Sequence, residues 1–539
     1  MTNSFKFTFD DDSGKIQVSS ESTILMSQLI DVFTIPNPQY FYLQSRGYGF
    51  VDESLSVITT LGTFKSGLFP LVYKSALKIV GGDASRIEID EIAKSKIIKA
   101  CMPLKGKLPN DCEIDDICES LPLRDYQREA VHTLLKYGSG ICLSPTSSGK
   151  SLIQATLINE IRKHKFLDEY DKPTILVLVP SRQLVDQMYK DFTTYGLTDF
   201  CMFTSNSGFK RDGTFMDNSC SDGFANVIIT NHSWLKNQYK TERFKKLKIG
   251  CIIADEVHTV SYGTEAMKIV EKINPPLKFG FTGTLKDDLF KQWTTFGMFG
   301  VTVYNIDIKT LQCENFITPL EVQPIYGVIK DMIGKKKCPF SLNRTVKLND
   351  ILEDGTIIDT NTAYSMELEY LESHANEIYS SVFKLISEEF DFQNKNMIVL
   401  FDRTNIGRII ESQLQSLLGD RCKILYTDGS TDISIREGIR EQLEKGVGHV
   451  LIAQTVTAST GLNIKNLHGI VFAFYGRSYV RVVQSIGRVL RLSKNKTVAK
   501  LYDLWYNTRY STRYHDDKMK IFRTTYGEKS IKEAKRVEI

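Results

Sequence analysis

A chain of 539 residues is too long for one hydrophobic core and predicts roughly three to four domains. Its 42% hydrophobic and 24% charged residues are typical of globular protein, and no apolar run approaches the ~20 residues of a membrane span. The N-terminus lacks the apolar segment of a signal peptide, so we expect a soluble protein that works inside a cell. Ten cysteines without a Cys-x-x-Cys pair argue against both a disulfide framework and structural zinc.

The net charge of +4 is unevenly distributed along the chain. From Ala473 to the C-terminus there are 16 Lys/Arg and 6 Asp/Glu, a local charge of +10, so the remainder carries −6. A basic, tyrosine-containing end suits a polyanionic partner. A solvated basic tail without a specific ligand is the alternative.

Residues 1–105 predict a small α/β accessory domain. Strand-like pieces at Phe5–Phe9, Tyr40–Leu43 and Leu55–Ile58 alternate with turn-rich joints. Through Asn110 there are 12 Lys/Arg and 11 Asp/Glu, so purely electrostatic binding of nucleic acid is not indicated, although a local basic face stays open. An acidic stretch, Asn110–Glu119, follows as a linker.

The remainder predicts two successive doubly wound α/β domains, 106–312 and 313–539. Continuous apolar runs favour parallel strands covered on both faces. In the first domain these runs are Ile141–Leu143, Thr174–Val179, Val227–Thr230, Cys251–Ala254 and Phe279–Thr282. In the second they are Met397–Phe401, Ile424–Tyr426, Val450–Ala453, Ile470–Ala473 and Ala499–Leu504, with helices around Asn405–Leu418, Ile435–Lys445 and Val480–Leu490. The stretch from Lys335 to Thr362 is left unassigned.

The loop Ser144–Ser151 joins a predicted strand to a predicted helix. Free N–H groups and the helix dipole at such a junction favour a phosphate ligand. Lys150 would reach the β- and γ-phosphates, and Ser151 would ligate Mg²⁺. The strict phosphate-loop pattern has glycine where this chain has Ser144, so an ordinary helix N-terminus capped by Ser147 or Ser148 is the alternative.

Two carboxylates, Asp255 and Glu256, follow an apolar strand and should lie at the C-terminal edge of the first sheet, where open α/β folds bind ligands. There Asp255 could hold Mg²⁺, directly or through water, and Glu256 could orient and deprotonate the attacking water. Turn residues without a chemical role are the alternative.

The second domain offers positively charged side chains that could stabilise phosphoryl transfer. If the stretch Gln484–Arg491 is helical, Gln484, Arg488 and Arg491 lie four and three residues apart on one face. An arginine placed on the γ-phosphate can contribute about 10³–10⁵ in rate. Surface ion pairing is the alternative role for the two arginines.

In this order and spacing, the motifs resemble those of the superfamily 2 helicases: Gln127, Pro145–Ser151, Asp255–His258, Phe281–Thr284, Ser459–Asn463 and Gln484–Arg491. The resemblance covers about residues 120–510. It is strongest to the UvsW-type helicases of large tailed phages, through Pro145–Ala155, Phe296–Gly300, Ser459–Gly461, Lys465–Leu467 and Ile486–Arg491.

The resemblance implies two RecA-like domains that use ATP and Mg²⁺. It assigns adenine to Gln127, the metal to Ser151 and Asp255, water activation to Glu256, and the γ-phosphate to Gln484, Arg488 and Arg491. The nucleotide also contacts Pro145, Thr146, Ser147, Ser148, Gly149, Lys150, Ser151 and Gly461. Thr282 and Thr284 couple hydrolysis to motion, and Thr460 lies between nucleotide and nucleic acid. Backbone phosphates of the nucleic acid contact Pro180, Ser181, Arg182, Thr230 and Asn231.

Three departures from the family pattern bear on loop geometry, coupling and nucleic-acid grip. Ser147 replaces a glycine, Asn463 stands where aspartate is common, and Asn231 stands where threonine is frequent. None removes a charge needed for hydrolysis.

The sequence therefore predicts an ATP-dependent DNA helicase or translocase that remodels forks and recombination intermediates in replication, recombination and repair. We expect a monomer whose partner is DNA, without a membrane partner, and with single-stranded-DNA-binding or recombination proteins as further candidates. A phage-encoded enzyme of this kind would act in the host-cell cytoplasm. The alternatives are an RNA-directed motor, a non-hydrolysing nucleic-acid scaffold, and the motor subunit of a restriction or nuclease complex.

Overall fold

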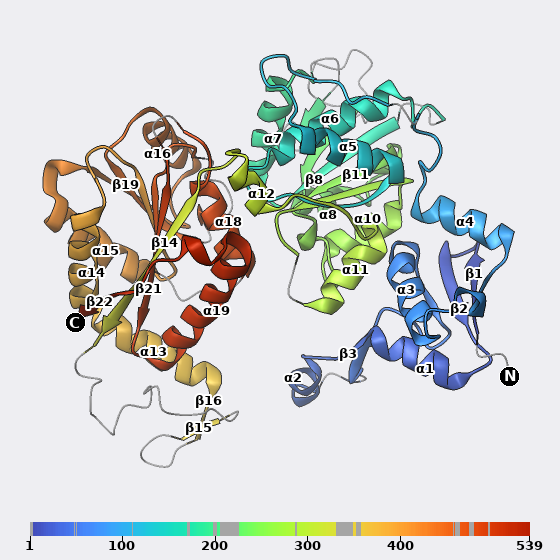
Figure 1. Ribbon diagram of the computed structural model, residues 1–539, viewed down its shortest axis with the longest axis horizontal. Coiled ribbons are helices and arrows are strands. Elements are labelled where there is room, and N and C mark those ends of the chain that lie inside the picture. The colour runs from blue at the N-terminus through green and yellow to red at the C-terminus, as the bar shows by residue number, and fades with distance from the viewer. Residues whose placement is uncertain are drawn as a thin grey trace. The chain divides into compact units, whose positions relative to one another are not determined.

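The computed structural model describes residues 4–539 except 48, 50, 110–111, 170–172, 198–201, 205–225, 286–287, 330–348, 352–356, 456, 459–463, 474–478 and 494–495. The chain divides into two compact units (Figure 1). The first comprises Met1–Ser144 and Gly149–Ile306, and the second comprises Pro145–Ser148 and Asp307–Ile539.

The first unit begins with a small four-stranded sheet in the order β5-β2-β1-β6. Alternating apolar residues explain its core, because Phe5 and Phe7 of one strand and Ile16 and Val18 of its neighbour are fully buried on one face. The strands are β1 (Phe5–Asp10), β2 (Lys15–Ser19), β5 (Thr63–Lys65) and β6 (Ile87–Ile89). The main helices are α1 (Thr23–Val32), α3 (Phe69–Ile79) and α4 (Glu91–Cys101).

The predicted strand at Tyr40–Leu43 is wrong. Its residues belong to the short helix α2 (Tyr40–Ser45), which lies between the paired strands β3 (Thr34–Pro36) and β4 (Ser54–Ser56). Four successive apolar or aromatic residues have no periodicity that separates strand from helix. Phe41 is 81% exposed, so no sheet covers this segment.

The N-terminal sheet domain packs directly against the larger part of the first unit. The 3₁₀ turn Ser66–Leu68 meets α11 (Leu289–Phe299) so closely that a Cβ on Gly67 would lie 2.1 Å from the carbonyl oxygen of Phe296. The rings of Phe33 and Trp293 are 5.4 Å apart, and Lys65 pairs with Glu271 at 2.9 Å. The contact is therefore a close-packed interface with backbone against backbone.

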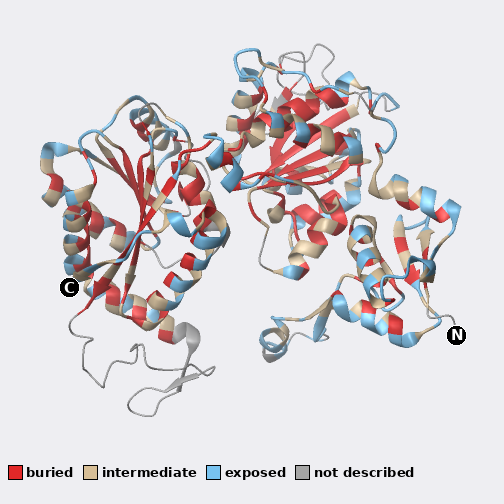
Figure 2. Ribbon diagram, viewed as in Figure 1, coloured by how far each residue is buried: buried red, intermediate tan, exposed pale blue. Residues whose placement is uncertain are grey.

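The larger part of the first unit is a seven-stranded, all-parallel sheet in the order β13-β7-β12-β11-β8-β10-β9. Figure 2 shows its strands buried between helices, as their continuous apolar character predicts. The strands are β7 (Ser139–Leu143), β8 (Pro173–Val179), β9 (Met202–Thr204), β10 (Val227–Asn231), β11 (Lys248–Asp255), β12 (Leu277–Thr282) and β13 (Thr302–Asn305). The helices include α5 (Asp125–Tyr137), α6 (Lys150–Lys163), α7 (Arg182–Thr194), α8 (His232–Gln238), α9 (Glu242–Lys245) and α10 (Glu265–Ile273).

The second unit contains another all-parallel seven-stranded sheet, in the order β18-β19-β17-β20-β21-β14-β22. Its strands are β14 (Leu320–Val328), β17 (Met397–Phe401), β18 (Lys423–Thr427), β19 (His449–Gln454), β20 (Gly469–Phe472), β21 (Ala499–Tyr506) and β22 (Lys535–Glu538). Its helices include α12 (Ile308–Cys313), α13 (Thr360–Ser373), α14 (Ala375–Glu389), α15 (Thr404–Leu418), α16 (Ile433–Lys445), α18 (Tyr479–Val489) and α19 (Arg509–Tyr526). The predicted fold class, a small α/β domain followed by two doubly wound parallel sheets, is confirmed.

The basic C-terminal end is an integral part of the second unit. Helix α19 packs on β21 through buried residues that include Tyr510, Met519 and Phe522, and β22 adds a parallel strand beside β14. A solvated tail is therefore excluded for this segment. Among the described residues, no helix combines the length and the apolar character needed to cross a membrane.

Candidate functional site

Three neighbouring strands of the first large sheet bring the predicted catalytic segments to one edge. In the order β7-β12-β11, Leu143 pairs with Thr282 and Phe281 pairs with Asp255. Because all three strands are parallel, their C-terminal ends lie together, which is where such sheets bind ligands. The loop after β7, Asp255 at the end of β11 and Thr282 at the end of β12 therefore form one site.

The loop between β7 and α6 is held by short internal contacts. Ser144 N–H donates to the carbonyl of Thr282 at 2.8 Å, and the Ser148 hydroxyl donates to the carbonyl of Pro145 at 2.7 Å. Gly149 has φ +81°, and a Cβ there would lie 2.3 Å from Nε2 of Gln127. The backbone conformation thus favours glycine before Lys150, and a larger residue would also displace the end of the Gln127 side chain.

Ser147 also adopts the left-handed conformation, with φ +76°. This conformation favours glycine and costs a residue with a Cβ about 1–2 kcal/mol. The position where the sequence departs from the family's glycine is therefore a strained position. Helix α6 begins directly afterwards at Lys150 and directs its first free N–H groups toward the loop.

Lys150 lies between the two predicted carboxylates. Its Nζ is 2.6 Å from Oε1 of Glu256 and 3.2 Å from Oδ1 of Asp255. The side chains of Lys150, Asp255 and Glu256 are only 15%, 9% and 18% exposed. Burial disfavours the ammonium, but the two carboxylates more than offset this and raise the pKa of Lys150.

The pKa values of the two carboxylates are shifted in opposite directions. Burial raises the pKa of Asp255 above its ordinary value despite Lys150. Burial also opposes ionisation of Glu256, but Lys150 and His258 hold the pKa of this carboxyl well below its ordinary value. Glu256 is therefore ionised at neutral pH, and its backbone is in the left-handed region with φ +47°.

Further side chains connect this cluster to the neighbouring strand. Oγ1 of Thr282 is 3.0 Å from Oε2 of Glu256 and 2.8 Å from Nδ1 of His258. The N–H of Thr284 donates to the same hydroxyl oxygen at 3.2 Å. Glu256, His258, Thr282 and Thr284 thus form a continuous hydrogen-bonded chain.

Sequence reasoning did not assign a role to Gln154 or His258. Nε2 of Gln154 donates to Oδ1 of Asp255 at 3.1 Å from a fully buried position on α6. Gln154 lies four residues after Lys150, so helical spacing puts the two side chains on one face, and this signal could have identified it. His258 required knowledge of the strand order, because it contacts Thr282 on a different strand.

Two further residues of this unit that were predicted to contact the nucleotide are Gln127 and Ser151. The buried side chain of Gln127 accepts the N–H of Arg124 at 2.9 Å and forms a capping box at the start of α5. Oγ of Ser151 is 3.3 Å from the Tyr195 hydroxyl. Gln127 and Ser151 therefore both lie next to the loop, on α5 and α6.

In this unit, the residues predicted to contact nucleic acid lie where β8 and β10 end, and these adjacent strands end in register at Val179 and Asn231. Pro180 and Ser181 lead into α7, and Arg182 is exposed at its first residue. Thr230 is fully buried, and the side chain of Asn231 accepts the N–H of Trp234 as the N-cap of α8. Asparagine is a strong N-cap, which accounts for the departure at this position. Thr460 and Gly461 lie outside the described residues.

In the second unit, Gln484 and Arg488 lie four residues apart on α18. The helix ends at Val489, so the prediction of one helical face for all three residues is wrong for Arg491. Beyond the helix, backbone carbonyls accept hydrogen bonds from outside it. The carbonyl of Leu490 accepts the N–H of Thr318 at 2.8 Å, and the carbonyl of Arg491 accepts Nζ of Lys496 at 2.5 Å. These bonds replace the helical ones.

The chain thus combines two all-parallel sheets with a lysine–carboxylate cluster at the edge of the first. The family described as the type III restriction enzyme, res subunit, matches residues 120–287, and the helicase conserved C-terminal domain matches residues 380–493. These matches confirm the resemblance to the superfamily 2 helicases, whose members use ATP.

Particular relatives are consistent with this class. The chain is 28% identical to the ATP-dependent DNA helicase uvsW of Enterobacteria phage T4 over 381 residues, or 70% of this chain and 67% of the relative. It is 23% identical to the DNA 3'-5' translocase XPB2 of Sulfurisphaera tokodaii, over 70% of this chain and 80% of that protein. The DNA-bound structure of the ATP-dependent Type ISP restriction-modification enzyme LlaBIII shares the fold, with a TM-score of 0.53, 14% identity, and coverage of 78% of this chain and 31% of that one.

Proposed function

We propose that this protein is an ATP-driven DNA helicase or translocase that unwinds or branch-migrates forked DNA and recombination intermediates. The observation that carries the proposal is the position of Lys150 between Asp255 and Glu256 at the C-terminal edge of the first sheet. Similarity to a phage DNA helicase and an archaeal DNA translocase supports DNA as the substrate.

The residues at this edge fit ATP with Mg²⁺. The bound nucleotide supplies the γ-phosphoryl group, and the metal offsets the charge on its oxygens. Oxygen ligands such as those of Ser151 and Asp255 are the type that Mg²⁺ prefers. Asp255 already holds a cation, since the ammonium of Lys150 is 3.2 Å away. On nucleotide binding Lys150 exchanges its carboxylate partners for phosphate oxygens, while the loop Pro145–Gly149 surrounds the phosphates.

Glu256 is the proposed general base. Its ionised side chain orients water and accepts its proton. Because Thr282 lies 3.0 Å from Glu256 and its hydroxyl accepts the N–H of Thr284, a change at the carboxylate alters both threonines. This contact supports the coupling role that we propose for Thr282 and Thr284.

The remaining nucleotide contacts follow from the motif assignments. We assign adenine to Gln127, which packs against Gly149. We assign the γ-phosphate to Gln484, Arg488 and Arg491, with Gly461 as a further nucleotide contact. The guanidinium groups supply positive charge as the phosphoryl group leaves.

DNA is held through its backbone in this proposal. Ser181, Arg182 and the helix N-terminus of α7 follow the same sheet edge as Thr230 and Asn231 and suit phosphate contacts that do not depend on base sequence. Pro180 shapes this turn, and Thr460 contributes from the second unit. We propose three functional domains, 1–105, 106–312 and 313–539. We also propose that the protein acts as a monomer in the host cell. Its protein partners would be recombination proteins or single-strand-binding proteins.

The decisive test compares ATPase and strand-displacement activity on forks, four-way junctions, plain duplex, single strands and RNA hybrids. We expect stimulation by branched DNA. Glu256→Gln should retain DNA binding but lose turnover, whereas Lys384→Ala, an exposed lysine on α14, should match the wild type. If only RNA stimulated the ATPase, RNA and not DNA would be the substrate. If Glu256→Gln left turnover unchanged, Glu256 would not be the general base.

A motor subunit of a restriction complex is a second candidate, because the matched family carries that description. It predicts ATP-dependent DNA translocation without strand displacement, and cleavage only when a nuclease partner is added. The same panel separates the two, since a helicase displaces the labelled strand by itself.

A further inference from the structure

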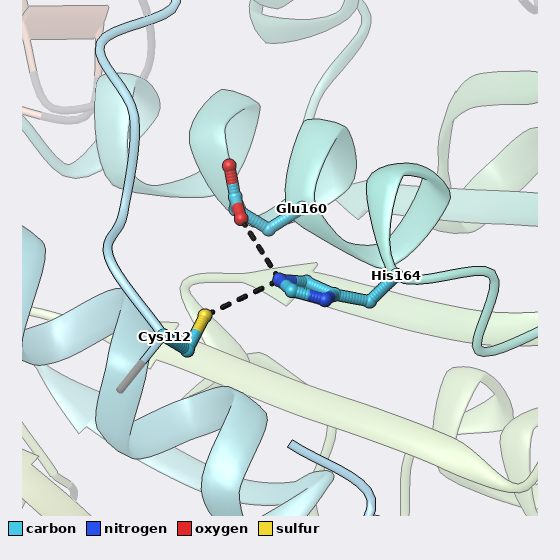
Figure 3. A group of neighbouring side chains, drawn as sticks. All are labelled: Cys112, Glu160 and His164. Carbon is cyan, nitrogen blue, oxygen red and sulfur yellow. Dashed lines mark hydrogen bonds and ion pairs between the residues drawn. The ribbon is translucent and has the colours of Figure 1, made fainter. Parts of the chain in front are cut away.

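Three metal-ligating side chains meet at the end of α6 opposite Lys150 (Figure 3). Glu160 lies on the last turn of α6, His164 follows four residues later, and Cys112 comes from the segment that connects the N-terminal domain to α5. Sγ of Cys112 and Oε2 of Glu160 are each 3.3 Å from Nε2 of His164. One ligand atom from each residue lies within 4.8 Å of the others.

Glu160 is the buried charge of the cluster. Its side chain is fully buried, and among the described residues its oxygens make ion pairs, with His164 at 3.3 Å and Lys163 at 3.6 Å, but no hydrogen bond of good geometry. Lys163 is shared between two carboxylates, since its ammonium is 3.6 Å from Glu160 and 2.5 Å from Asp115. A buried carboxylate without hydrogen bonds is costly unless a cation compensates it.

Two of the three spacings between ligand atoms are close to those around a zinc ion. With bonds of about 2.3 Å to sulfur and about 2.0–2.2 Å to nitrogen or oxygen, tetrahedral geometry puts sulfur and nitrogen about 3.5 Å apart and nitrogen and oxygen about 3.4 Å apart. The corresponding distances here are both 3.3 Å. The ring of His164 is also fixed in orientation, because it stacks on Phe166 with centroids 5.4 Å apart.

We propose that Cys112, Glu160 and His164 bind a zinc-type divalent cation, with water as the fourth ligand. A thiolate and an imidazole select a borderline-soft ion over Mg²⁺ or Ca²⁺, so this site differs in chemistry from the one at Ser151 and Asp255. The two negative ligands neutralise the ion. The bound metal joins the connecting segment to the helix that begins with Lys150.

The connecting segment is already fastened next to the site, which keeps Cys112 in place for a metal. Asp116 accepts the N–H of Leu123 at 2.7 Å and pairs with Arg128 at 2.7 Å. The metal adds an attachment at Cys112, which is nearer to the N-terminal domain than these contacts are.

The full-length protein, reduced and loaded with Co²⁺ or Zn²⁺, provides the test. We expect one zinc per chain to survive dialysis against a weak chelator, and cobalt to show a thiolate charge-transfer band with tetrahedral d–d bands. Cys112→Ser and Glu160→Gln should lose the retained zinc, and Cys112→Ser should lose the charge-transfer band. Cys313→Ser, at an exposed cysteine, should keep both signals.

The competing explanation is a hydrogen bond from His164 shared by Sγ and Oε2 without metal. It predicts no retained zinc and no charge-transfer band in the wild-type protein, a result that overturns the proposal even if the variants fold poorly. An unchanged band in Cys112→Ser also overturns it. Cobalt bound at Asp255 would give no thiolate band, so the band reports the Cys112 site alone. Metal content is measured independently of ATPase activity, so a failure of the zinc proposal is distinguishable from a failure of the proposed function.

Discussion

Lys150 in the first unit and Lys518 in the second are both held by carboxylates, but in different surroundings. Lys150 lies at a sheet edge, 15% exposed, between Asp255 and Glu256. Lys518 on α19 is 2% exposed and pairs with the fully buried Asp503 on β21, which His515 also contacts at 2.8 Å.

The two clusters also differ in backbone conformation. Glu256 and the nearby Ser147 are in the left-handed region, whereas Asp503 and Lys518 lie within a regular strand and helix. The ring of Trp505 stacks on His515 with centroids 4.4 Å apart, and Lys518 lies 5.9 Å from the centroid of Phe472. The second cluster lies in regular secondary structure and is packed by an aromatic ring, whereas the first includes strained backbone at a sheet edge. We therefore expect Lys518 to serve stability and Lys150 to exchange partners when a nucleotide binds.

The largest effect should come from Lys518→Ala. Removing the ammonium leaves Asp503 buried without its main partner, which costs about 3–5 kcal/mol of unfolding free energy. Denaturant unfolding followed by tryptophan fluorescence measures the loss, since Trp505 packs on this cluster. Lys520→Ala, at the 74% exposed lysine two residues later, should change stability by no more than about 0.5 kcal/mol. Equal losses in both variants would contradict the structural role.

Lys150→Ala should show the opposite pattern. We expect DNA-stimulated turnover to fall about 10²–10³-fold or more, because a preorganised positive charge on the phosphates is lost. DNA binding should persist. The free energy of unfolding should change less than in Lys518→Ala, because Glu256 keeps its hydrogen bond from Thr282 and Asp255 keeps its hydrogen bond from Gln154. Steady-state ATPase assays and denaturant unfolding of the same preparation check both statements, and full turnover would refute the assignment of the site.

A pH titration tests the second cluster without removing the lysine. Burial opposes ionisation of Asp503, but Lys518 and His515 outweigh it and lower its pKa below the ordinary value of 3.8. A folded pKa below the unfolded one contributes stability above the unfolded value, and this contribution disappears as the pH falls through the folded value. The difference in unfolding free energy between wild type and Asp503→Asn should therefore stay constant from about pH 7 to 5 and shrink below about pH 4. If the unfolding free energies of wild type and Asp503→Asn kept the same difference down to pH 3, this explanation would be contradicted.

The smallest effect concerns the strain at Ser147. Ser147→Gly should be more stable than Ser147→Ala by about 1 kcal/mol, because both lose the hydroxyl but only glycine relieves the left-handed backbone. Thermal unfolding of the two variants measures the difference. If alanine equals glycine, the loop conformation at this position is unstrained.

The strands that carry the edge cluster could be predicted because their apolar character is continuous. The four residues Cys251–Ala254 of β11, for example, are all buried, as expected of a parallel strand covered on both faces. The sequence also located Lys150, Asp255 and Glu256, since a strand end determines where its next residue lies. The contact of His258 with Thr282 could not be predicted, because it depends on which strands are neighbours.

Other elements escaped prediction for local reasons. Strand β14 contains Pro324, which ordinarily argues against a strand flanked on both sides, and β22 consists largely of charged residues at the edge of the sheet. The zinc-type cluster combines a helical pair, Glu160 and His164, with Cys112 from about fifty residues earlier. No fixed spacing reveals such a set.

The contact of Gly67 with α11 determines how the protein can be shortened. Trp293 and Phe296 of α11 pack against the apolar core of the N-terminal domain. A truncated protein that begins near residue 106 would expose these rings to water and present an apolar patch prone to aggregation. For expression and biochemical work, the minimal folded fragment that retains Lys150, Asp255 and Glu256 therefore includes the first hundred residues.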